Sequence, residues 1–567
     1  MLRSVPVNTL VVDESARAPE SSGTEWASSE HAALFVFLLA EAVAFVFYAV
    51  VSRPMWFYLD EWDFLSDRTA WNIHDLFRAH NEHWVTLPVL VYRGLWWVFG
   101  LNSYRPYQFV IILLHLIAAL LVRTIMRRIG VRPWTATVVA SVLVFFGSGY
   151  QNIVLPFQMT LVGALVFGLV DILYATHEGG FDRRDVYGLL AGLAAVMCSG
   201  VGVAMIIAVG VAVLLLRGWR LALLHTAPFA AAYLAWFVWI GHVGYDGYHA
   251  SPGQVVRFVR TFVAATFGAL GHYRGVGIVL GVMLIAGLLV AWLPLDRIEL
   301  RRQAAIPVAL LVGALALLTI TGYGRAGVRS FTEKSRYLHL VAALVLPAFG
   351  VAVDALMRKW RALIPAVIVL LLVGIPSNIN LIVNYMHRGI VTTQGPYKQM
   401  MLSIPRISTA KEVPRDVKPD QYLAHFVTVG WLLDGVASGR IPRPGKLSTP
   451  DIAMADLRLS FLQKAAPFVP GVDGECVTIN DRMVWSLQPG ERIVMHAPNN
   501  SVRVLPANIG AFSTYPFRII TVVGANVVAV RPVQFRLSNS GTRASPYAQV
   551  CAAEPIVRAA QATSTRR

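Results

Sequence analysis

Residues 32–52 read AALFVFLLAEAVAFVFYAVVS, and this stretch decides the fold. It is long enough to cross the hydrocarbon core of a bilayer as an α-helix, which takes about 20 apolar residues. The whole chain of 567 residues continues in this style, because 56% of its residues are hydrophobic and only 14% are charged. A soluble protein of this length has too little interior to hide so much apolar surface. We therefore expect an α-helical polytopic membrane protein.

Further apolar runs of this length predict about eleven transmembrane helices in all. The fifth and sixth runs are short and separated only by Ser199 and Gly200, so they form either a re-entrant pair or one kinked unit. Residues 1–31 are too polar, and the first run too long, for a cleavable signal peptide, so we expect a retained anchor. The runs lie near residues 32–52, 104–122, 135–150, 157–175, 186–199, 200–216, 221–241, 276–294, 303–321, 337–356 and 362–381.

Arginine and lysine cluster in every second connection between the expected helices. Such clusters mark cytoplasmic loops, and the alternation places residues 1–31 on the same side. The segment 53–103, the loops 242–275 and 322–336, and the tail after about residue 382 then face outward, which predicts a multi-pass cell-membrane protein. The clusters are Arg123, Arg127, Arg128 and Arg132; Arg183 and Arg184; Arg217 and Arg220; Arg297, Arg301 and Arg302; and Arg358, Lys359 and Arg361.

The tail, residues 382–567, has no run that could span a membrane and predicts an extracytoplasmic domain. About 395–470 is typical of helices and loops. From about residue 470, short apolar pieces between turn residues favour a mainly β domain, a sandwich or small barrel. Cys476 and Cys551 fall in this domain, where thiols can oxidise, so we expect a disulfide between them, with two free thiols as the alternative. The apolar pieces are 477–479, 483–487, 492–495, 501–505, 518–522 and 527–530.

Three carboxylates follow the first helix in YLDEWDFL, residues 58–65. They are Asp60, Glu61 and Asp63. Charges so close to lipid are costly unless they sit in a wet cavity with partners. The cluster is therefore a candidate functional site on the outer face.

The late outward loop is unusually basic for its predicted side. The arginine side chain offers a planar fork of donors that matches phosphate oxygens, and the glycines of this loop let backbone amides approach the same group. We expect an anionic ligand here, the alternative being pairing with lipid headgroups or with the three carboxylates. The residues concerned are Arg325, Arg329, Lys334, Arg336 and Tyr337.

A third outward element reads HNEHW, residues 80–84. We expect its polar and aromatic side chains, His80, Glu82, His83 and Trp84, to shape an acceptor pocket. The two histidines with Glu82 would alternatively hold a metal. The following residues 85–99 are apolar and aromatic but interrupted by Pro88, Arg93 and Gly94, which favours a helix lying along the outer membrane surface.

In this order, the features resemble the GT-C superfamily of integral membrane glycosyltransferases, which includes protein mannosyltransferases and the aminoarabinose transferase of lipid A. The resemblance covers about residues 32–381. It is carried by the Asp60-Glu61 pair in the first outward loop and by the basic loop from Arg325 to Tyr337. The sequence lacks the Trp-Trp-Asp signature of oligosaccharyltransferases, which argues against transfer of a whole oligosaccharide to Asn.

The resemblance implies a sugar donor linked to polyprenyl phosphate and a cell-envelope glycan or glycolipid as acceptor, on the outer leaflet. Transfer with inversion needs a base beside the acceptor hydroxyl and a cation beside the departing phosphate. We expect Asp60 to be the base. Glu61 would orient the acceptor or exchange roles with Asp60, and Asp63 would orient either one or help hold a divalent cation. Arg325 and Arg336 with Tyr337 would hold the donor phosphate, assisted by Lys334 or Arg329.

The composition indicates a habitat, and two other functions remain as alternatives to the glycosyltransferase. Richness in Ala, Val and Arg suits a high-GC bacterium, where a plasma-membrane mannosyltransferase or arabinosyltransferase would be natural. A transporter or lipid flippase is the alternative, but the charges gather at the outer face and no internal repeat is visible. A non-catalytic envelope scaffold would leave the acid pair without a purpose. The sequence has no zinc-site spacing, no P-loop and no Gly-rich dinucleotide-binding turn, so we do not expect a cytosolic domain that hydrolyses nucleotides.

Overall fold

Long apolar helices make up most of the protein. The computed structural model describes residues 21–244, 249–327, 335–421, 423–446, 448–465, 475–478, 484–496, 501–507, 517–520, 525–539 and 549–552. Within these residues, eight helical stretches are long and apolar enough to cross a membrane. They are α1 (Ser21–Val51), α4 (Arg105–Arg128), α7 (Met159–Ala175) with the turn before it, α10 (Trp219–Trp239), α12 (Arg274–Trp292), α13 (Arg297–Arg325), α14 (Ser335–Lys359) and the run that contains α15 (Ile364–Leu372) and α16 (Ile375–Asn384).

The remaining expected spans are helical but short. α5 (Pro133–Val144), α8 (Arg183–Val196) and α9 (Val201–Arg217) have 12, 14 and 17 residues. An ideal helix rises about 1.5 Å per residue, so all three fall short of the roughly 30 Å of a hydrocarbon core, α9 by the least. A polytopic helical membrane protein is confirmed in outline, and the total of about eleven spans stays a prediction.

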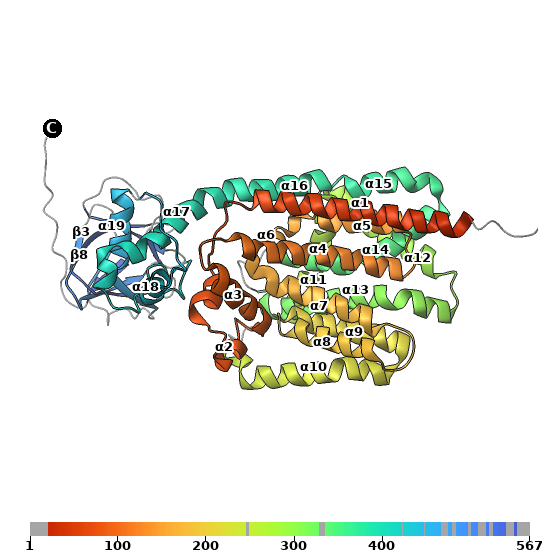
Figure 1. Ribbon diagram of the computed structural model, residues 1–567, viewed down its shortest axis with the longest axis horizontal. Helices are drawn as coiled ribbons and strands as arrows, with labels where there is room; N and C mark the ends of the chain where they lie inside the picture. Colours follow the sequence, from red (N-terminus) through yellow and green to blue (C-terminus); the bar gives the residue numbers. More distant parts are fainter. Residues whose placement is uncertain are drawn as a thin grey trace, which may run out of the picture.

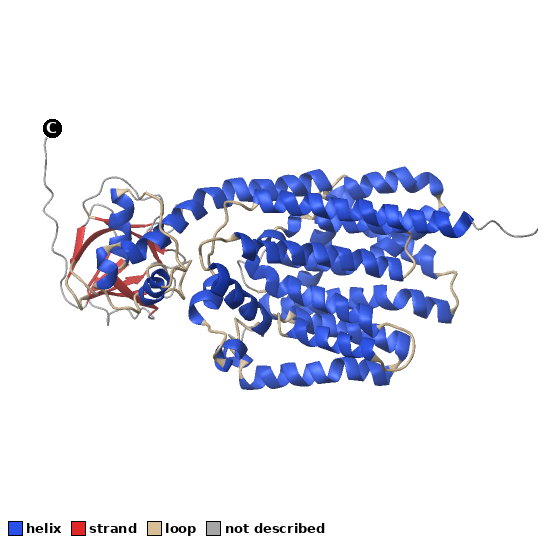
Figure 2. Ribbon diagram, in the orientation of Figure 1, coloured by secondary structure: helices blue, strands red, loops and turns tan. Residues whose placement is uncertain are grey.

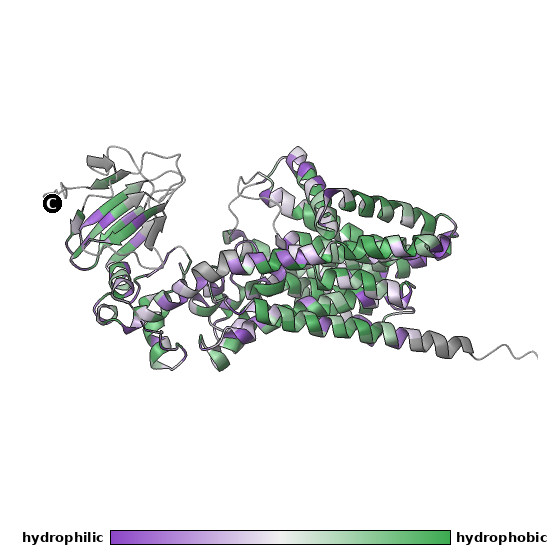
Figure 3. Ribbon diagram, turned by 90° about the horizontal axis from the view of Figure 1, so that it is seen from above, coloured by the Kyte–Doolittle hydropathy of each residue, from purple (hydrophilic) through white to green (hydrophobic). Residues whose placement is uncertain are grey.

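The outside of the bundle is apolar, as lipid contact requires. Large hydrophobic side chains on α1, α10 and α12 are exposed in numbers that would be untenable in water. The ribbon coloured by hydropathy shows that apolar residues predominate along the helices of the bundle (Figure 3). Within the bundle, α14 is almost entirely buried. Examples of the exposed residues are Phe35, Val43 and Val46 on α1, Leu234 and Val238 on α10, and Ile278, Val282 and Ile285 on α12.

The stretch 242–275, expected to be a loop, contains the helix α11 (Pro252–Gly271). Arg257 and Arg260 break its apolar run, so composition alone hides the helix. Its buried residues Phe258, Phe262, Thr266 and Leu270 recur every fourth position and pack on the bundle, which is the pattern of an amphipathic helix.

Short helices fill the connections at the end of the bundle that carries the acid cluster (Figure 1). The expected surface helix at 85–99 is present as α3. The tail enters through α17 and continues through short helices to α19. These elements are η1 (Asp63–Asp67), α2 (Ile73–Phe77), α3 (Thr86–Phe99), η2 (Gly147–Gly149), α6 (Gln151–Val154), η3 (Pro156–Gln158), η4 (Gly241–Gly244), η6 (Tyr385–Ile390), α17 (Val391–Ser403), η7 (Ile404–Arg406), η8 (Ser408–Lys411), α18 (Val429–Ala437) and α19 (Thr449–Arg458). The short helix η5 (Arg361–Leu363) joins α14 to α15 at the opposite end.

The β region is a sandwich of two antiparallel sheets (Figure 2). One sheet has the order β1-β7-β4-β9-β2 and the other β3-β8-β5-β6. Both sheets contribute buried side chains to one core, among them Ile493, Val504 and Phe535. The strands are β1 (Phe461–Ala465), β2 (Glu475–Thr478), β3 (Val484–Leu487), β4 (Arg492–His496), β5 (Ser501–Pro506), β6 (Phe517–Ile520), β7 (Ala525–Ala529), β8 (Val533–Asn539) and β9 (Gln549–Ala552).

The first part of the tail packs on the membrane bundle. Buried residues of the tail from Tyr397 to Ile441, with Ala455 and Leu459 of α19, share one apolar core with the helices, whereas Met454 and Leu457 of α19 belong to the separate core of the sandwich. The indole Nε1 of Trp62 donates to the Tyr397 hydroxyl at 2.9 Å, and the rings of Trp96 and Trp431 stack 4.9 Å apart. The change from bundle to sandwich therefore falls near residue 460, and the tail lies at the same end of the bundle as the acid cluster.

Candidate functional site

The acid cluster begins with a backbone kink after α1. Leu59 has a φ of 54°, and its amide donates to the carbonyl of Leu423 at 2.7 Å. Beyond the kink the chain turns helically, with the amide of Asp63 donating to the carbonyl of Asp60 at 3.2 Å. Residues three apart on such a turn share a face, whereas neighbours do not. Asp60 and Asp63 therefore lie on one side and Glu61 on the other.

Glu61 points into an aromatic core and is only 2% exposed. It accepts hydrogen bonds from the hydroxyl of Tyr92 at 2.7 Å, from that of Tyr104 at 3.1 Å and from the amide of Tyr58 at 3.1 Å. Burial raises the pKa of Glu61 to about 8, and the three hydrogen bonds oppose this only in part. The placement argues against the expectation that Glu61 orients the acceptor or exchanges roles with Asp60.

Asp63 is buried and fully engaged. Its Oδ2 accepts from Arg68 Nη2 at 2.7 Å and contacts His80 Nδ1 at 2.6 Å, while Oδ1 accepts from Arg78 Nη2 at 3.1 Å. Burial raises the pKa of this carboxyl, but the His80 and Arg68 contacts outweigh it and the pKa is lowered. Arginine and histidine occupy its oxygens, so Asp63 suits an orienting role better than the alternative of holding a divalent cation.

His80 connects the two carboxylates that share a face. Its Nδ1 contacts Asp63, and its Nε2 lies 3.8 Å from Asp60 Oδ2 with no hydrogen bond of its own. Burial lowers the pKa of His80, yet the contacts with Asp60 and Asp63 outweigh it and the pKa is raised. A carboxylate that orients a histidine is a feature of catalytic triads, and here the oriented imidazole lies beside a second carboxylate, Asp60.

Asp60 is the carboxylate that reaches solvent. Its side chain is 42% exposed, whereas that of Asp63 is 2% exposed. Burial of the remainder raises the pKa of Asp60, but His80, His425 and Arg336 outweigh this effect, so the pKa is lowered and the group is ionised near neutral pH. Asp60 can therefore accept a hydrogen bond or a proton from a ligand at this end of the bundle.

The histidine segment forms a tight turn. The backbones of His80 and His83 bond to each other at 3.0 and 3.1 Å, and Asn81 takes the left-handed conformation that asparagine tolerates. Glu82 forms an ion pair with Arg325 at 3.0 Å. Burial, Arg325 and other nearby positive groups lower the pKa of His83 to about 3. With Glu82 committed to Arg325, the alternative of a metal held by this turn has no support.

Trp84 is a packing residue. Its side chain is 6% exposed, its indole Nε1 donates to Thr86 Oγ1 at 2.6 Å, and its ring stacks on Trp236 at 5.8 Å. An acceptor sugar has no access to a ring covered on this face. The expectation that Trp84 binds the acceptor is therefore not supported.

Two basic residues of the late loop approach the acids from the far end of the sequence. Arg325 ends α13 and pairs with Glu82 of the histidine turn. Arg336 lies in the first turn of α14, with its guanidinium 5.3 Å from the ring centre of the buried Tyr337. Its charge lowers the pKa of Asp60 and of His83. Its Nε is buried and has no hydrogen-bond partner. Arg329 and Lys334 lie outside the described residues.

Several residues at this site were not singled out from the sequence. Arg68 and Arg78 lie within the outward segment 53–103, but nothing in their spacing links them to Asp63. His425 comes from the tail and acts electrostatically on Asp60. Only the three-dimensional approach of the tail to the bundle reveals this last contribution.

The cysteine expectation has partial backbone support. Cys476 and Cys551 are register partners in the antiparallel pair of β2 and β9. Cys551 is disulfide-bonded, and Cys198 is a buried free thiol. The side chain of Cys476 lies outside the described residues, so its pairing stays a prediction.

One group in the described part of the chain has the spacing of a metal site, namely His177, Asp182 and Asp185. It lies at the end of the bundle away from Asp60. Its members already contact one another and the cation of Arg217. It therefore does not supply the divalent cation considered for the acid cluster.

Comparison with known proteins does not add a family to these observations. A scan against protein-family models finds no match, and a search of curated proteins finds no relative.

Proposed function

We propose that the chain is a membrane glycosyltransferase that moves a sugar from a polyprenyl-phosphate donor to a hydroxyl of a cell-envelope glycan or glycolipid. The observation that carries the proposal is Asp60, a solvent-reaching carboxylate backed by the His80 and Asp63 pair and within electrostatic reach of Arg336. A base and a phosphate-binding cation beside each other are the two groups that this chemistry needs.

In the proposed reaction, the acceptor hydroxyl oxygen bonds to the anomeric carbon while the bond from that carbon to the phosphate oxygen breaks. The hydroxyl proton passes to Asp60. The lipid phosphate leaves with the bonding electrons, and Arg336 with Arg325 stabilises its charge. Arrival of the anionic donor would also offset the effect of Arg336 on Asp60 and raise the basicity of the carboxylate.

His80 and Asp63 act as positioning residues in this scheme. Asp63 is anchored by Arg68 and Arg78, so it can fix the orientation of the imidazole. The imidazole in turn faces Asp60 from 3.8 Å. General-base assistance is typically worth about 10² to 10⁴ in rate, so loss of Asp60 should be measurable well above background.

The test is release of polyprenyl phosphate from polyprenyl-phosphate mannose and from the corresponding arabinose donor, with envelope glycan as acceptor. Asp60→Asn should lower the rate by about 10² or more while donor binding persists. Asp416→Asn removes an exposed carboxylate from the tail and serves as the matched control. Near-normal turnover in the Asp60 variant would refute the assignment. Lipid movement across the bilayer without sugar release would favour the transporter or flippase alternative.

A further inference from the structure

A cavity of about 1160 Å³ opens at the end of the bundle opposite Asp60. Its walls come from segments far apart in the sequence that meet at this end (Figure 1). They are the turn after α4, the connection between α7 and α8, the ends of α9, α12 and α14, and the start of α13. By the distribution of arginine and lysine, this is the predicted cytoplasmic end.

The cavity is basic on one side and apolar on the other. Its basic lining residues are Arg128, Arg217, Arg302, Arg358 and Lys359, and its acidic ones are Glu178, Glu299 and Asp354. Apolar side chains including Val131, Leu216, Val290 and Ile306 form the rest. A ligand that fits such a lining carries negative charge at one end and hydrocarbon at the other.

The acidic residues do not neutralise the basic ones completely. Asp354 pairs with Arg358 and also with Arg132 outside the cavity, at 2.7 Å each, and Glu178 pairs with Arg302. Within the described part of the chain, Arg128 donates to the backbone carbonyls of Leu173 and Thr176 and pairs with no carboxylate. The lining thus keeps cationic donors for a ligand.

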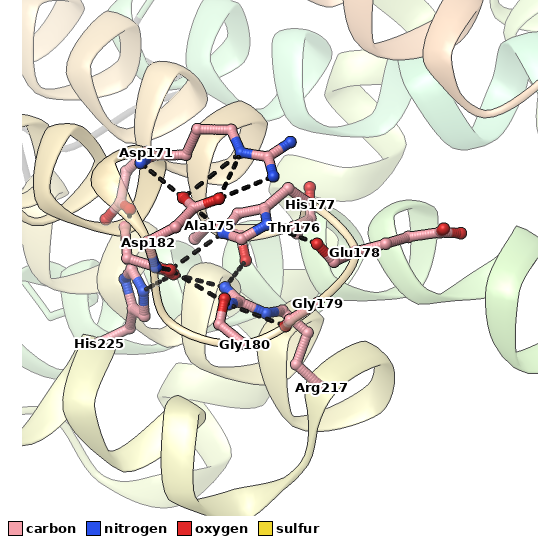
Figure 4. Close-up of polar contacts among 12 residues, drawn as sticks. Asp171, Ala175, Thr176, His177, Glu178, Gly179, Gly180, Asp182, Arg217 and His225 are labelled. Carbon is pink, nitrogen blue, oxygen red and sulfur yellow. Dashed lines mark hydrogen bonds and ion pairs between the residues drawn. The ribbon is translucent and has the colours of Figure 1, made fainter.

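Arg217 shows that part of the lining is rigidly built (Figure 4). Its Nη1 and Nη2 bind the two oxygens of the buried Asp185 at 2.5 and 3.1 Å. His177 and His225 hold the same carboxylate at 2.9 and 3.0 Å. The Arg217 side chain is 4% exposed, and its Nε is buried without a hydrogen-bond partner. A guanidinium held in place with an unused donor is suited to an incoming oxyanion.

We propose that this cavity binds the phosphate group of an anionic lipid in the adjoining leaflet, with the acyl chains against its apolar wall. Free phosphate shares the headgroup chemistry but would leave the apolar wall unused. The site is separated from Asp60 by the length of the bundle, so the proposal does not rest on the proposed sugar transfer.

The experiment is native mass spectrometry of the full chain in detergent, titrated with dioleoyl phosphatidylglycerol, with dioleoyl phosphatidylcholine or with inorganic phosphate. The test variant is Arg302→Gln with Arg358→Gln, both exposed residues of the cavity rim. The matched control is Arg301→Gln with Arg361→Gln, exposed arginines at the same end outside the lining.

Wild type should prefer phosphatidylglycerol. Loss of each cation should weaken phosphatidylglycerol binding about fivefold. The test variant should therefore bind this lipid roughly 25-fold more weakly than wild type, and the control should keep the wild-type affinity. Equal losses in both variants would mean diffuse surface charge and would overturn the proposal, as would an unchanged test variant. Binding of inorganic phosphate without phosphatidylglycerol would overturn the lipid assignment. Thermal unfolding midpoints equal to wild type show that the variants are folded.

Discussion

Replacing Glu61 with glutamine should make the protein more stable at alkaline pH. The pKa of Glu61 rises from 4.5 to about 8 because the carboxyl is buried among aromatic rings. Each pKa unit is worth about 1.4 kcal/mol, so ionising this group in the folded state costs up to about 5 kcal/mol. Because its folded pKa lies above its unfolded pKa, the folded state binds the extra proton, and its stability falls as pH rises from 4.5 to about 8.

Glu61→Gln keeps the shape and can still accept from the hydroxyls of Tyr92 and Tyr104 through its one oxygen. It loses the bond that Oε2 accepts from the amide of Tyr58, which costs the same at every pH, and it cannot ionise. Its unfolding midpoint, followed by tryptophan fluorescence in detergent, should therefore exceed that of wild type by an amount that grows between about pH 5 and about pH 8. Glu412→Gln, at an exposed carboxylate, is the control and should show no such divergence. The variant should also retain the proposed sugar transfer, because Glu61 has no role in it. Wild-type and Glu61→Gln curves that stay parallel across this pH window would refute the reasoning.

Three further substitutions probe the machinery around Asp60. His80→Gln should move the acidic limb of the rate profile to higher pH, because burial then raises the pKa of Asp60 without the opposing imidazole; an unmoved limb would contradict the contact. Arg68→Ala should destabilise folding by up to about 3 to 5 kcal/mol, because the buried Asp63 loses its most buried cation and keeps only Arg78 and His80 as partners, and denaturant titration measures this. Arg336→Lys should weaken donor binding while leaving the unfolding midpoint unchanged, since lysine lacks the planar fork; donor titration with the wild-type affinity retained would count against a phosphate contact.

The bundle could be predicted in advance because apolar runs of spanning length leave few alternatives. Each of the expected runs is helical, and each of the expected β segments overlaps a strand. The helix α11 was not predicted, because Arg257 and Arg260 interrupt its apolar run and its buried residues recur only every fourth position. β1, β8 and β9 were not predicted either, and β9 takes part in the register that aligns Cys476 with Cys551.

The candidate site was predictable in its residues but not in their division of roles. Sequence order places Asp60, Glu61 and Asp63 within four positions, and it leaves Asp60 and Glu61 interchangeable as base and Asp63 with two possible roles. Burial separates them, because phenols surround Glu61, arginines anchor Asp63, and Asp60 alone of the three reaches solvent. Arg68, the partner of Asp63, lies only five residues away in the sequence, but no recognisable motif links the two residues. The role of each carboxylate depends on the face of the helical turn from which its side chain projects, and the composition of the segment does not reveal that face.

A single backbone conformation sets these faces. The left-handed φ of Leu59 costs a residue with a Cβ roughly 1 to 2 kcal/mol. The hydrogen bond from the Leu59 amide to the carbonyl of Leu423 holds this kink in place, and Leu423 belongs to the tail. Because the helical turn starts directly after the kink, its phase determines that Asp60 faces outward and Glu61 inward. The tail thus supplies His425 to the site and also holds the geometry that exposes one carboxylate and buries its neighbour.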